Sequence, residues 1–430
     1  MERIAETSRP LEGELTVPGD KSISHRAVIF AAIAEGTSRI YNLSGGEDNS
    51  RTVHAFKETG VRLWEDGGAL HVEGKGWEGL RPPREVIDCG NSGTTMRLLA
   101  GVLAGRPFVS VLDGDASLRL RPMMRVIEPL EKMGARIASQ DGKGLAPLTI
   151  EGGALRGVRY ASAIASAQVK SAILLAGLQA DGVTEVEEPQ KSRDHTEIMA
   201  AAFGARIKVE GTSVSVAGPQ RLSGRDVEVP GDLSSAAFFM VAAAGIPGSD
   251  VTVRNVGRNP TRSGILDVLQ RMGAGVALVR PRELGGEPVA DIQVRGARLK
   301  GVEIGAEMVA RTIDEYPILC IAAALAEGVT TISGAKELRY KESDRIAVMA
   351  KGLRKVGVRV DEREDGLTIE GRQRLRGSKI ETHGDHRVAM SFAVAGLCAD
   401  GGVELDDAKC ADISFPGFFR ALESLRNGKK

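Results

Sequence analysis

The chain has 430 residues, and its 57 Lys and Arg residues balance 57 Asp and Glu residues to a formal net charge of zero. This balance argues against a protein that wraps nucleic acid, and an aromatic content of 4% leaves few platforms for stacking bases. Scattered cysteines without a CxxC pair, no apolar N-terminal run and no stretch of membrane-spanning length predict a cytoplasmic protein without a signal peptide or membrane contact.

Along the chain one pattern recurs six times, at intervals of about 70 residues, a spacing that indicates repeated supersecondary units. Each repeat has a polar or Gly-containing turn, an Ala-, Leu- and Val-rich helix, a short strand, usually a second helix that ends at Gly, and closing strands. We expect β-α-β-α-β-β units whose helix N-termini attract anions. The turns span residues 18–26, 89–97, 163–171, 230–235, 311–317 and 383–390.

Three repeats precede residue 229 and three follow it, which predicts two similar domains. The strand within residues 13–19 (G-E-L-T-V-P-G) resembles residues 226–231 (D-V-E-V-P-G), and both precede a repeat helix. The sequence alone does not say which domain holds the first of these strands.

The first turn, P-G-D-K-S-I-S-H-R, opens a helix with Lys21, Ser22 and Arg26. Lys21 and Arg26 are a little more than one helical turn apart, so both can point toward one ligand. Arg offers a bidentate fork and Lys a mobile point charge. Taken alone, the motif fits equally well a capping Ser beside two solvated cations.

The second and third turns place small and polar residues at helix starts. Gly93, in N-S-G-T, would let a ligand approach the backbone, although an ordinary N-cap explains this motif by itself. Arg119 and Arg121 lie in the run R-L-R-P-M, an apolar context in which arginines need anions to neutralise them. Gln168, in S-A-Q, either fills a satisfied core position or reads a hydroxyl.

Three later segments concentrate charge. K-S-R-D-H at residues 191–195 fits a solvated loop, and K-E-S-D-R at 341–345 fits an exposed helix face with charges four residues apart. D-H-R at 385–387 opens a very apolar helix, where charges are poor candidates for simple surface. The histidines form neither H-x-x-x-H nor H-E-x-x-H, and the P-loop and hydrolase-elbow motifs are missing from the sequence, so we expect no metal site and no nucleotide loop.

In combination and in order, P-G-D-K-S-I-S-H-R, G-N-S-G-T-T-M-R, L-R-L-R-P-M, K-E-S-D-R and G-D-H-R-V-A-M-S resemble the 3-phosphoshikimate 1-carboxyvinyltransferase family, also called 5-enolpyruvylshikimate-3-phosphate (EPSP) synthase. The resemblance covers nearly the whole chain. It implies an α/β (α+β) fold of two globular domains, each of three β-α-β-α-β-β units around a pseudo-threefold axis. The implied domains are 19–228, and 1–18 with 229–430, with the active site in the cleft between them.

The resemblance also implies the reaction, which belongs to the shikimate pathway of aromatic amino acid biosynthesis. The enolpyruvyl group of phosphoenolpyruvate passes to the 5-hydroxyl of shikimate 3-phosphate and phosphate leaves, without an organic cofactor or a metal. We expect a monomer that binds these two small molecules and no nucleic acid. The substrates together carry roughly −5 to −6 charges. A matching excess of cations comes from Lys21, Arg26, Arg121, Arg193, Lys341, Arg345 and Arg387.

Residue roles carry over by motif. Asp314 would accept the 5-hydroxyl proton, Glu342 would give and retake the methylene proton, and Lys21 completes the catalytic set. An acid that works near neutrality needs a raised pKa, from burial or from a neighbouring carboxylate. The implied shikimate 3-phosphate set is Lys21, Ser22, Arg26, Ser166, Ala167, Gln168, Arg193, Asp314 and Lys341. The implied phosphoenolpyruvate set is Lys21, Asn91, Gly93, Arg121, Gln168, Glu342, Arg345, His386 and Arg387.

The sequence departs from the family pattern in places. His195 stands where many members carry Tyr, and Ile413 stands where some carry Lys, with Lys409 as an uncertain substitute. Gly93 leaves room that Ala would fill, so we expect the herbicide glyphosate to inhibit this protein. Charges divided between two domains also predict closure on ligand binding.

Two other readings remain. An enolpyruvyl transferase acting on UDP-N-acetylglucosamine would share the fold, but it usually has K-N at the first helix and a Cys on the loop that here reads D-A-S-L-R-L-R-P-M; no Cys lies between Cys89 and Cys320. A non-catalytic protein that binds anions or RNA ends would have a basic face without paired acids, which Asp314 and Glu342 oppose. Phosphate release on mixing both substrates discriminates among the three readings.

Overall fold

The computed structural model describes residues 2–427 except 8, 141 and 372–373. These residues form two compact units: unit 1 lies within residues 1–18, 230–283 and 288–430, and unit 2 comprises 19–229 and 284–287. Val229 and residues 284–287 thus belong to unit 2, whereas the predicted boundaries gave them to the other domain. The reason is that these residues contact unit 2 directly. The Val229 N–H donates to the Tyr41 carbonyl (3.0 Å), and Glu287 Oε1 lies 2.6 Å from His195 Nδ1.

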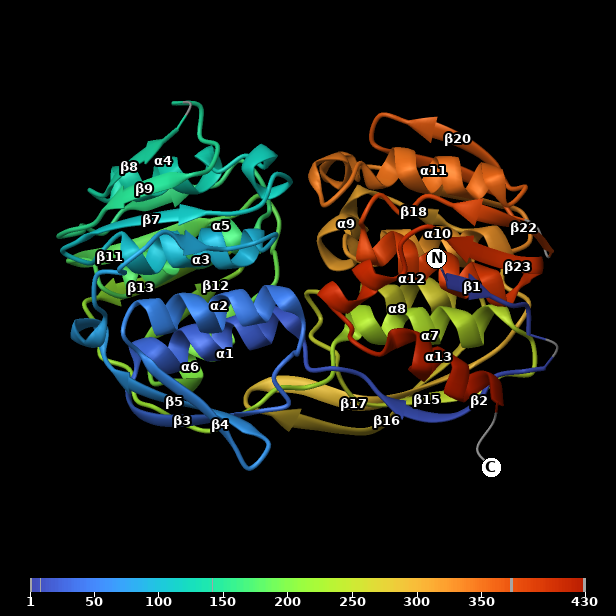
Figure 1. Ribbon diagram of the computed structural model, residues 1–430, viewed down its shortest axis with the longest axis horizontal. Helices are drawn as coiled ribbons and strands as arrows, with labels where there is room; N and C mark the ends of the chain where they lie inside the picture. The colour runs from blue at the N-terminus through green and yellow to red at the C-terminus, as the bar shows by residue number, and fades with distance from the viewer. Residues whose placement is uncertain (1, 8, 141, 372–373, 428–430) are drawn as a thin grey trace. The chain divides into compact units, whose positions relative to one another are not determined.

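Unit 2 contains three four-stranded sheets with one common strand order. In each sheet a short first strand runs parallel to the second, and the other two strands are antiparallel. The sheets are β14(Val227–Glu228)-β3(Glu35–Tyr41)-β5(Ala69–Lys75)-β4(Arg62–Asp66), β6(Ile87–Asp88)-β7(Val109–Asp113)-β9(Leu148–Glu151)-β8(Arg136–Ser139) and β10(Arg159–Ala161)-β11(Gly182–Glu187)-β13(Ser213–Gly218)-β12(Ile207–Glu210). Figure 1 labels three of the four strands of each sheet, among them β3, β7 and β11.

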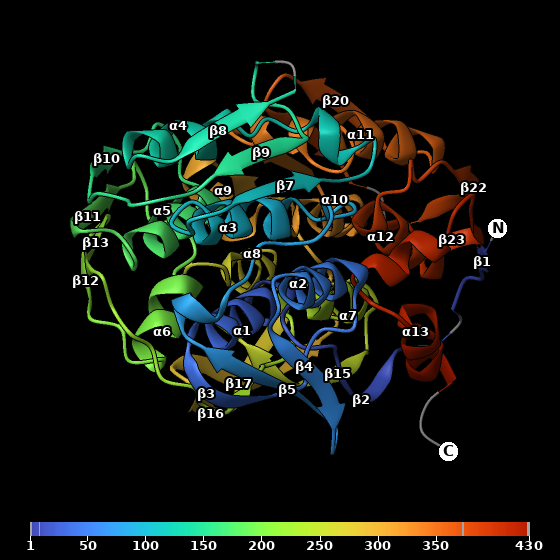
Figure 2. The same cartoon turned by 60° about the vertical axis from the view of Figure 1, so that its left-hand side comes forward.

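Two helices accompany each of these sheets, and Figure 2 shows α3 beneath β7 with α4 beside β8. The first helix of each repeat is the more apolar one, and it packs inside the unit. The helices are α1 (Lys21–Ile33), α2 (Glu47–Glu58), α3 (Gly93–Leu103), α4 (Met124–Lys132), α5 (Ala167–Gly177) and α6 (His195–Ala202), with 3-10 turns η1 (Trp77–Gly79) and η2 (Leu118–Leu120).

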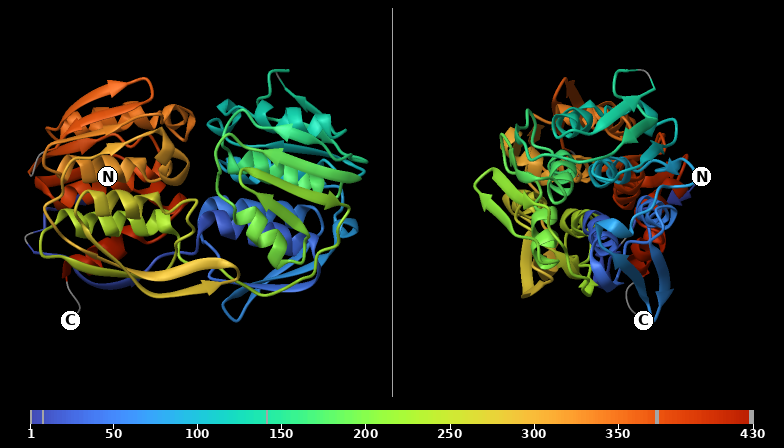
Figure 3. Two further views of the ribbon diagram at one scale, coloured as in Figure 1. Left: turned by 180° about the vertical axis from the view of Figure 1, so that it is seen from behind. Right: turned by 90° about the vertical axis from the view of Figure 1, so that its left-hand side faces the viewer.

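Unit 1 repeats this plan (Figures 1 and 3). Its sheets are β2(Glu12–Thr16)-β15(Asp250–Gly257)-β17(Glu287–Arg295)-β16(Gly275–Leu284), β18(Glu303–Ile304)-β19(Val329–Ile332)-β21(Gly366–Glu370)-β20(Arg359–Arg363) and β22(Leu375–Ile380)-β23(Ala399–Leu405)-β1(Glu2–Ile4). Its helices are α7 (Leu233–Gly245), α8 (Gly264–Arg271), α9 (Ala306–Thr312), α10 (Tyr316–Leu325), α11 (Arg345–Lys355), α12 (His386–Leu397) and α13 (Phe418–Asn427), with η3 (Lys336–Tyr340) and η4 (Lys409–Ile413).

The last repeat differs from the predicted β-α-β-α-β-β unit. Its sheet has three strands among the described residues, and β1 comes from the start of the chain, where Glu2 pairs with Leu405 in antiparallel register. Helix α13 follows η4, at the place where the other repeats have their second helix.

The two similar strands noted in the sequence have different destinations. β2 precedes α1 in the chain but pairs parallel with β15 in unit 1, whereas β14 precedes α7 but pairs parallel with β3 in unit 2. Each strand therefore completes the sheet of the other repeat.

Helices α7, α10 and α12 pack against one another inside unit 1. Every residue of α7 from Leu233 to Ala244 is buried, as expected for a helix that is apolar on all sides. Unit 1 and unit 2 have separate hydrophobic cores. The predicted Gly helix stops are confirmed, for example at Gly134 (φ 111°) after α4 and Gly357 (φ 86°) after α11. In the described part of the chain, none of the helices has the length and apolarity needed to cross a bilayer.

Candidate active site

In unit 2 the predicted residues lie at the starts of the inner helices. Asp20 caps α1 by accepting the Ile23 N–H (2.9 Å), and Lys21 forms an ion pair with Asp48 at the start of α2. Ser22 is half-buried, and its carbonyl accepts from Arg26 Nη1 (2.9 Å). The alternative reading of this turn, a capping Ser beside two solvated cations, is wrong, because Asp20 is the cap and protein groups hold both Lys21 and Arg26.

Arg26 links three helices from a buried position. Its side chain donates to Thr196 Oγ1 (2.6 Å) in α6 and to Ser171 Oγ (2.7 Å) in α5. Burial lowers the pKa of Arg26 to about 10, so the guanidinium remains charged at neutral pH. Three of its five N–H groups are used in these bonds and in the bond to the Ser22 carbonyl.

The start of α3 brings a second arginine group together. Ser92 caps the helix, accepting from the Thr95 N–H (3.2 Å), and Gly93 is buried. Arg121 donates to Asn91 Oδ1 (2.6 Å) and to the Asn91 carbonyl (3.2 Å), which places it beside this turn.

Gln168 in α5 is joined to α3 by two hydrogen bonds. Its Oε1 accepts from Arg97 Nη1 (2.6 Å), and its Nε2 donates to Thr94 Oγ1 (2.8 Å). A Cβ on Gly93 would lie 3.0 Å from Arg97 Nη1 and 3.5 Å from Arg121 Nη1. Sequence reasoning missed Arg97 as a member of this group, although Arg97 ends the quoted motif G-N-S-G-T-T-M-R.

The remaining unit 2 residues lie at α5 and α6. Ser166 and Ala167, both half-buried, are the N-cap and first residue of α5, and half-buried Arg193 precedes α6. His195 starts α6 but is buried against Glu287, so it presents no exposed ring at the position where many family members carry Tyr.

In unit 1, Arg345 is the centre of the charged group. It is 1% exposed and donates to Asp385 through Nε (2.9 Å) and Nη2 (3.3 Å), while Nη2 also lies 2.7 Å from Glu342. Burial disfavours the charged guanidinium, but Asp385 and Glu342 outweigh it, so the pKa of Arg345 is raised. Burial likewise acts to raise the pKa of Asp385, and the Arg345 charge outweighs it, so that pKa is lowered.

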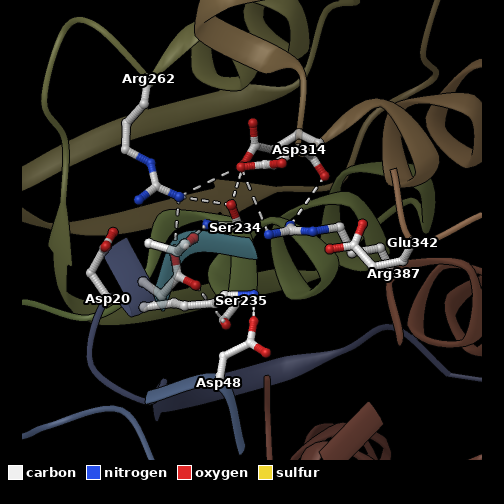
Figure 4. Close-up of polar contacts among 12 residues, drawn as sticks. Asp20, Asp48, Ser234, Ser235, Arg262, Asp314, Glu342 and Arg387 are labelled. Atoms are coloured by element: carbon white, nitrogen blue, oxygen red, sulfur yellow. Dashed lines mark hydrogen bonds and ion pairs between the residues drawn. The ribbon is translucent and has the colours of Figure 1, made fainter. Parts of the chain in front are cut away.

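Asp314 lies close enough to Arg345 for its charge to raise the Arg345 pKa, and Figure 4 shows Asp314, Arg387 and Glu342 in one region. Arg387 Nη1 donates to the Asp314 carbonyl (3.1 Å), and Nη2 lies 3.9 Å from the Asp314 carboxylate. His386, the first residue of α12, is buried, and Lys341 is half-buried ahead of α11. Each of the two proposed acids thus lies beside an arginine, Asp314 beside Arg387 and Glu342 beside Arg345.

Each unit therefore presents one polar set at or just before the starts of its helices. The unit 2 set is made of cations, two amides and hydroxyls, while the unit 1 set combines two half-buried carboxylates with arginines. Lys409 starts η4 and is exposed. Within the described residues, no cluster of three or more His, Cys, Asp or Glu side chains has a geometry that could hold a metal ion.

Comparison with known proteins gives one consistent result. The family model of EPSP synthase (3-phosphoshikimate 1-carboxyvinyltransferase) matches residues 5–422. The chain belongs to this family. The 3-phosphoshikimate 1-carboxyvinyltransferase of Geobacter sulfurreducens is 53% identical over 418 residues, covering 97% of each chain, and that of Halorhodospira halophila is 54% identical over 97% of this chain and 94% of its own.

Solved structures agree with this family assignment. EPSP synthase from Acinetobacter baumannii has a TM-score of 0.88 at 47% identity and covers 98% of this chain and 97% of its own. The enolpyruvyl transferase NikO from Streptomyces tendae, with a TM-score of 0.77 at 18% identity, shares the fold. The two-domain fold predicted from the motifs is confirmed, and membership of the EPSP synthase family disfavours the reading as a UDP-N-acetylglucosamine enzyme.

Proposed function

We propose that this chain transfers the enolpyruvyl group of phosphoenolpyruvate to the 5-hydroxyl of shikimate 3-phosphate and releases phosphate. The observation that carries the proposal is the EPSP synthase family match over residues 5–422. The reaction makes the chain a transferase of the shikimate pathway, which leads to aromatic amino acids.

In the proposed chemistry, Asp314 accepts the proton of the 5-hydroxyl while the hydroxyl oxygen bonds to C2 of phosphoenolpyruvate. Glu342 gives a proton to the methylene carbon, so that C3 becomes a methyl group. The adduct then collapses: the C2–O bond to phosphate breaks, the leaving phosphate takes up the proton held by Asp314, one methyl proton returns to Glu342 and the C2–C3 double bond forms again. The proton transfers use side chains that the structure places next to arginines, at the starts of α10 and α11.

The cations supply the other half of the chemistry. Phosphates and carboxylates of the two substrates need paired positive charge once water is displaced. We assign to shikimate 3-phosphate the unit 2 residues Lys21, Ser22, Arg26, Ser166, Ala167, Gln168 and Arg193. Lys341 of unit 1 is assigned to the same substrate. Phosphoenolpyruvate is assigned to Asn91, Gly93, Arg121, Arg345, His386 and Arg387, with Lys21 and Gln168 shared.

The proposal further places the enzyme in the cytoplasm as a monomer. All four cysteines are free, which suits a reducing compartment. Size-exclusion chromatography with light scattering tests the monomer, and a dimer mass would contradict it.

The test of function is phosphate release by the purified chain. We expect release when both substrates are mixed, and none with either substrate alone. Release with UDP-N-acetylglucosamine in place of shikimate 3-phosphate, or binding of both substrates without release, would overturn the proposal.

A further inference from the structure

The turn at residues 230–235, P-G-D-L-S-S, has no substrate role in the proposed function, although it matches the first turn closely. Both turns begin P-G-D, but Lys21 is replaced at the equivalent position by Leu233, which is fully buried. A helix start without a cation and with an apolar first residue offers little to a substrate anion. The reason for its polar residues must therefore lie within unit 1.

These polar residues belong to a buried cluster, which we call the Arg262 cluster: Asp232, Ser234, Arg262 and Glu315. Arg262 is 3% exposed and Glu315 is 0% exposed. Arg262 Nη2 donates to Ser234 Oγ (2.7 Å) and to Asp232 Oδ1 (3.0 Å), and lies 4.0 Å from Glu315 Oε1. The Ser234 hydroxyl in turn donates to the Glu315 carboxylate, and Figure 4 shows Arg262, Ser234 and Asp314 close together.

The cluster joins three segments of unit 1. Asp232 caps α7, Arg262 lies in the turn before α8, and Glu315 is the N-cap residue of α10. Glu315 directly follows Asp314, the proposed base. Two further hydrogen bonds hold residues 312–315. The Glu315 N–H donates to the Thr312 carbonyl (2.8 Å), and Arg387 donates to the Asp314 carbonyl (3.1 Å).

Burying the charges of this cluster costs free energy of folding, so we expect the cluster to serve a function. Removing an arginine and carboxylates from water is unfavourable, and apolar replacements of such groups are often neutral or stabilising. Arg262 is nearly inaccessible and directs Nη2 at groups of the protein, so a direct contact with substrate does not explain it. Its position next to Asp314 does.

We infer that the Arg262 cluster is a positioning device, in which Arg262 and Ser234 hold Glu315 and thereby aim the Asp314 carboxylate at the hydroxyl it deprotonates. The inference rests on the proposed function. A displacement of about 1 Å in a reacting group can cost on the order of a hundredfold in rate, so small shifts of residues 312–315 matter.

The experiment measures kcat and both KM values for Arg262→Met, Arg262→Lys and Ser234→Ala. In Arg262→Met, we expect kcat to fall about tenfold to a hundredfold with both KM values within about threefold of wild type. Arg262→Lys retains the charge and should recover part of kcat. Ser234→Ala removes only the hydroxyl that bridges Arg262 and Glu315, and should lower kcat by a smaller factor.

A matched control is Arg359→Met, which removes an arginine from the exposed Arg359–Glu370 pair (2.9 Å) of the same unit and should leave kcat unchanged. Unchanged kcat in folded Arg262→Met, or a raised KM with unchanged kcat, overturns the inference. If Arg262→Met does not fold, Ser234→Ala decides: unchanged kcat overturns the inference and a lower kcat at unchanged KM supports it. Wild-type enzyme without phosphate release would instead count against the proposed function itself.

Discussion

At the scale of single residues, Asp314 has the most specific task in the proposed reaction. Its half-buried carboxylate lies 3.9 Å from Nη2 of Arg387. We predict that Asp314→Ala lowers kcat by about 10²- to 10⁴-fold, the usual contribution of a general base, and changes substrate KM far less. Steady-state kinetics check this against Asp267→Ala, which removes a carboxylate that is about half accessible (47% of its side chain) and paired with Arg311. Equal losses in kcat and affinity would argue against a chemical role.

Gly93 determines the space beside two arginines. An added Cβ would lie 3.0 Å from Arg97 Nη1, so the guanidinium must shift in Gly93→Ala. We predict that glyphosate inhibits the wild type, and that Gly93→Ala raises both the KM for phosphoenolpyruvate and the inhibitory glyphosate concentration. Gly153→Ala is the control, because nothing lies within 4 Å of a Cβ there. Wild-type activity that persists at high glyphosate concentration would contradict the prediction.

His25 predicts a pH effect on stability. The ring is fully buried, its Nδ1 contacts Thr52 Oγ1 (2.7 Å), and among described residues its Nε2 finds no hydrogen-bond partner. Burial lowers the pKa of His25 from 6.5 to about 3. Between these two pKa values the unfolded chain binds a proton at His25 that the folded chain does not. The free energy of unfolding therefore has its full value above the unfolded-state pKa and decreases as the pH falls toward the folded-state pKa.

We therefore predict that His25→Asn makes the free energy of unfolding less dependent on pH between the two pKa values of His25. Denaturant unfolding at a series of pH values measures this. His54→Asn serves as the control because His54 is largely exposed, with 56% of its side chain accessible. An identical pH dependence in wild type and His25→Asn would show that His25 titrates normally in the folded protein.

At the scale of elements, the start of α12 depends on Asp385. Its carboxylate accepts the N–H groups of Arg387 (2.9 Å) and Val388 (3.4 Å) and also holds Arg345, so one side chain both caps the helix and neutralises a buried cation. We predict that Asp385→Ala destabilises the protein by about 3–5 kcal/mol, because an uncompensated charge remains buried. Denaturant unfolding checks this, with the exposed residue Asp361 replaced by Ala as the reference. A loss below about 1 kcal/mol, ordinary for a single substitution, would show that Arg345 finds another partner.

The elements also explain which parts of the repeat were predictable. Apolar helices and Gly stops have local causes, so their sequence signals are direct. The destinations of β2 and β14 have no local cause, since both strands precede a helix and both read as short alternating segments. Pairing partners far along the chain decide such strands, and β1 illustrates this most clearly by pairing with β23.

At the scale of the whole molecule, the proposal gives residues of both units to one pair of substrates. We therefore predict that shikimate 3-phosphate and glyphosate together make the molecule more compact, as substrate-driven domain closure does. Small-angle scattering with neither, one and both ligands measures this change in radius of gyration. The Arg121→Met variant, which lacks a proposed contact to the second ligand, should show less compaction. An unchanged radius with both ligands bound would remove the closure claim.

The sequence by itself determined the family, the reaction class and the helix starts that carry candidate residues, because these follow from local motifs in a fixed order. Only the tertiary structure decided how those residues are held. Arg26 is bound by Thr196 and Ser171, Gln168 by Arg97, and Arg345 by Asp385, and none of these partners is close in the chain. A buried charge must be satisfied by whichever groups folding brings within hydrogen-bond reach, and that proximity is a property of the packed helices rather than of any local motif.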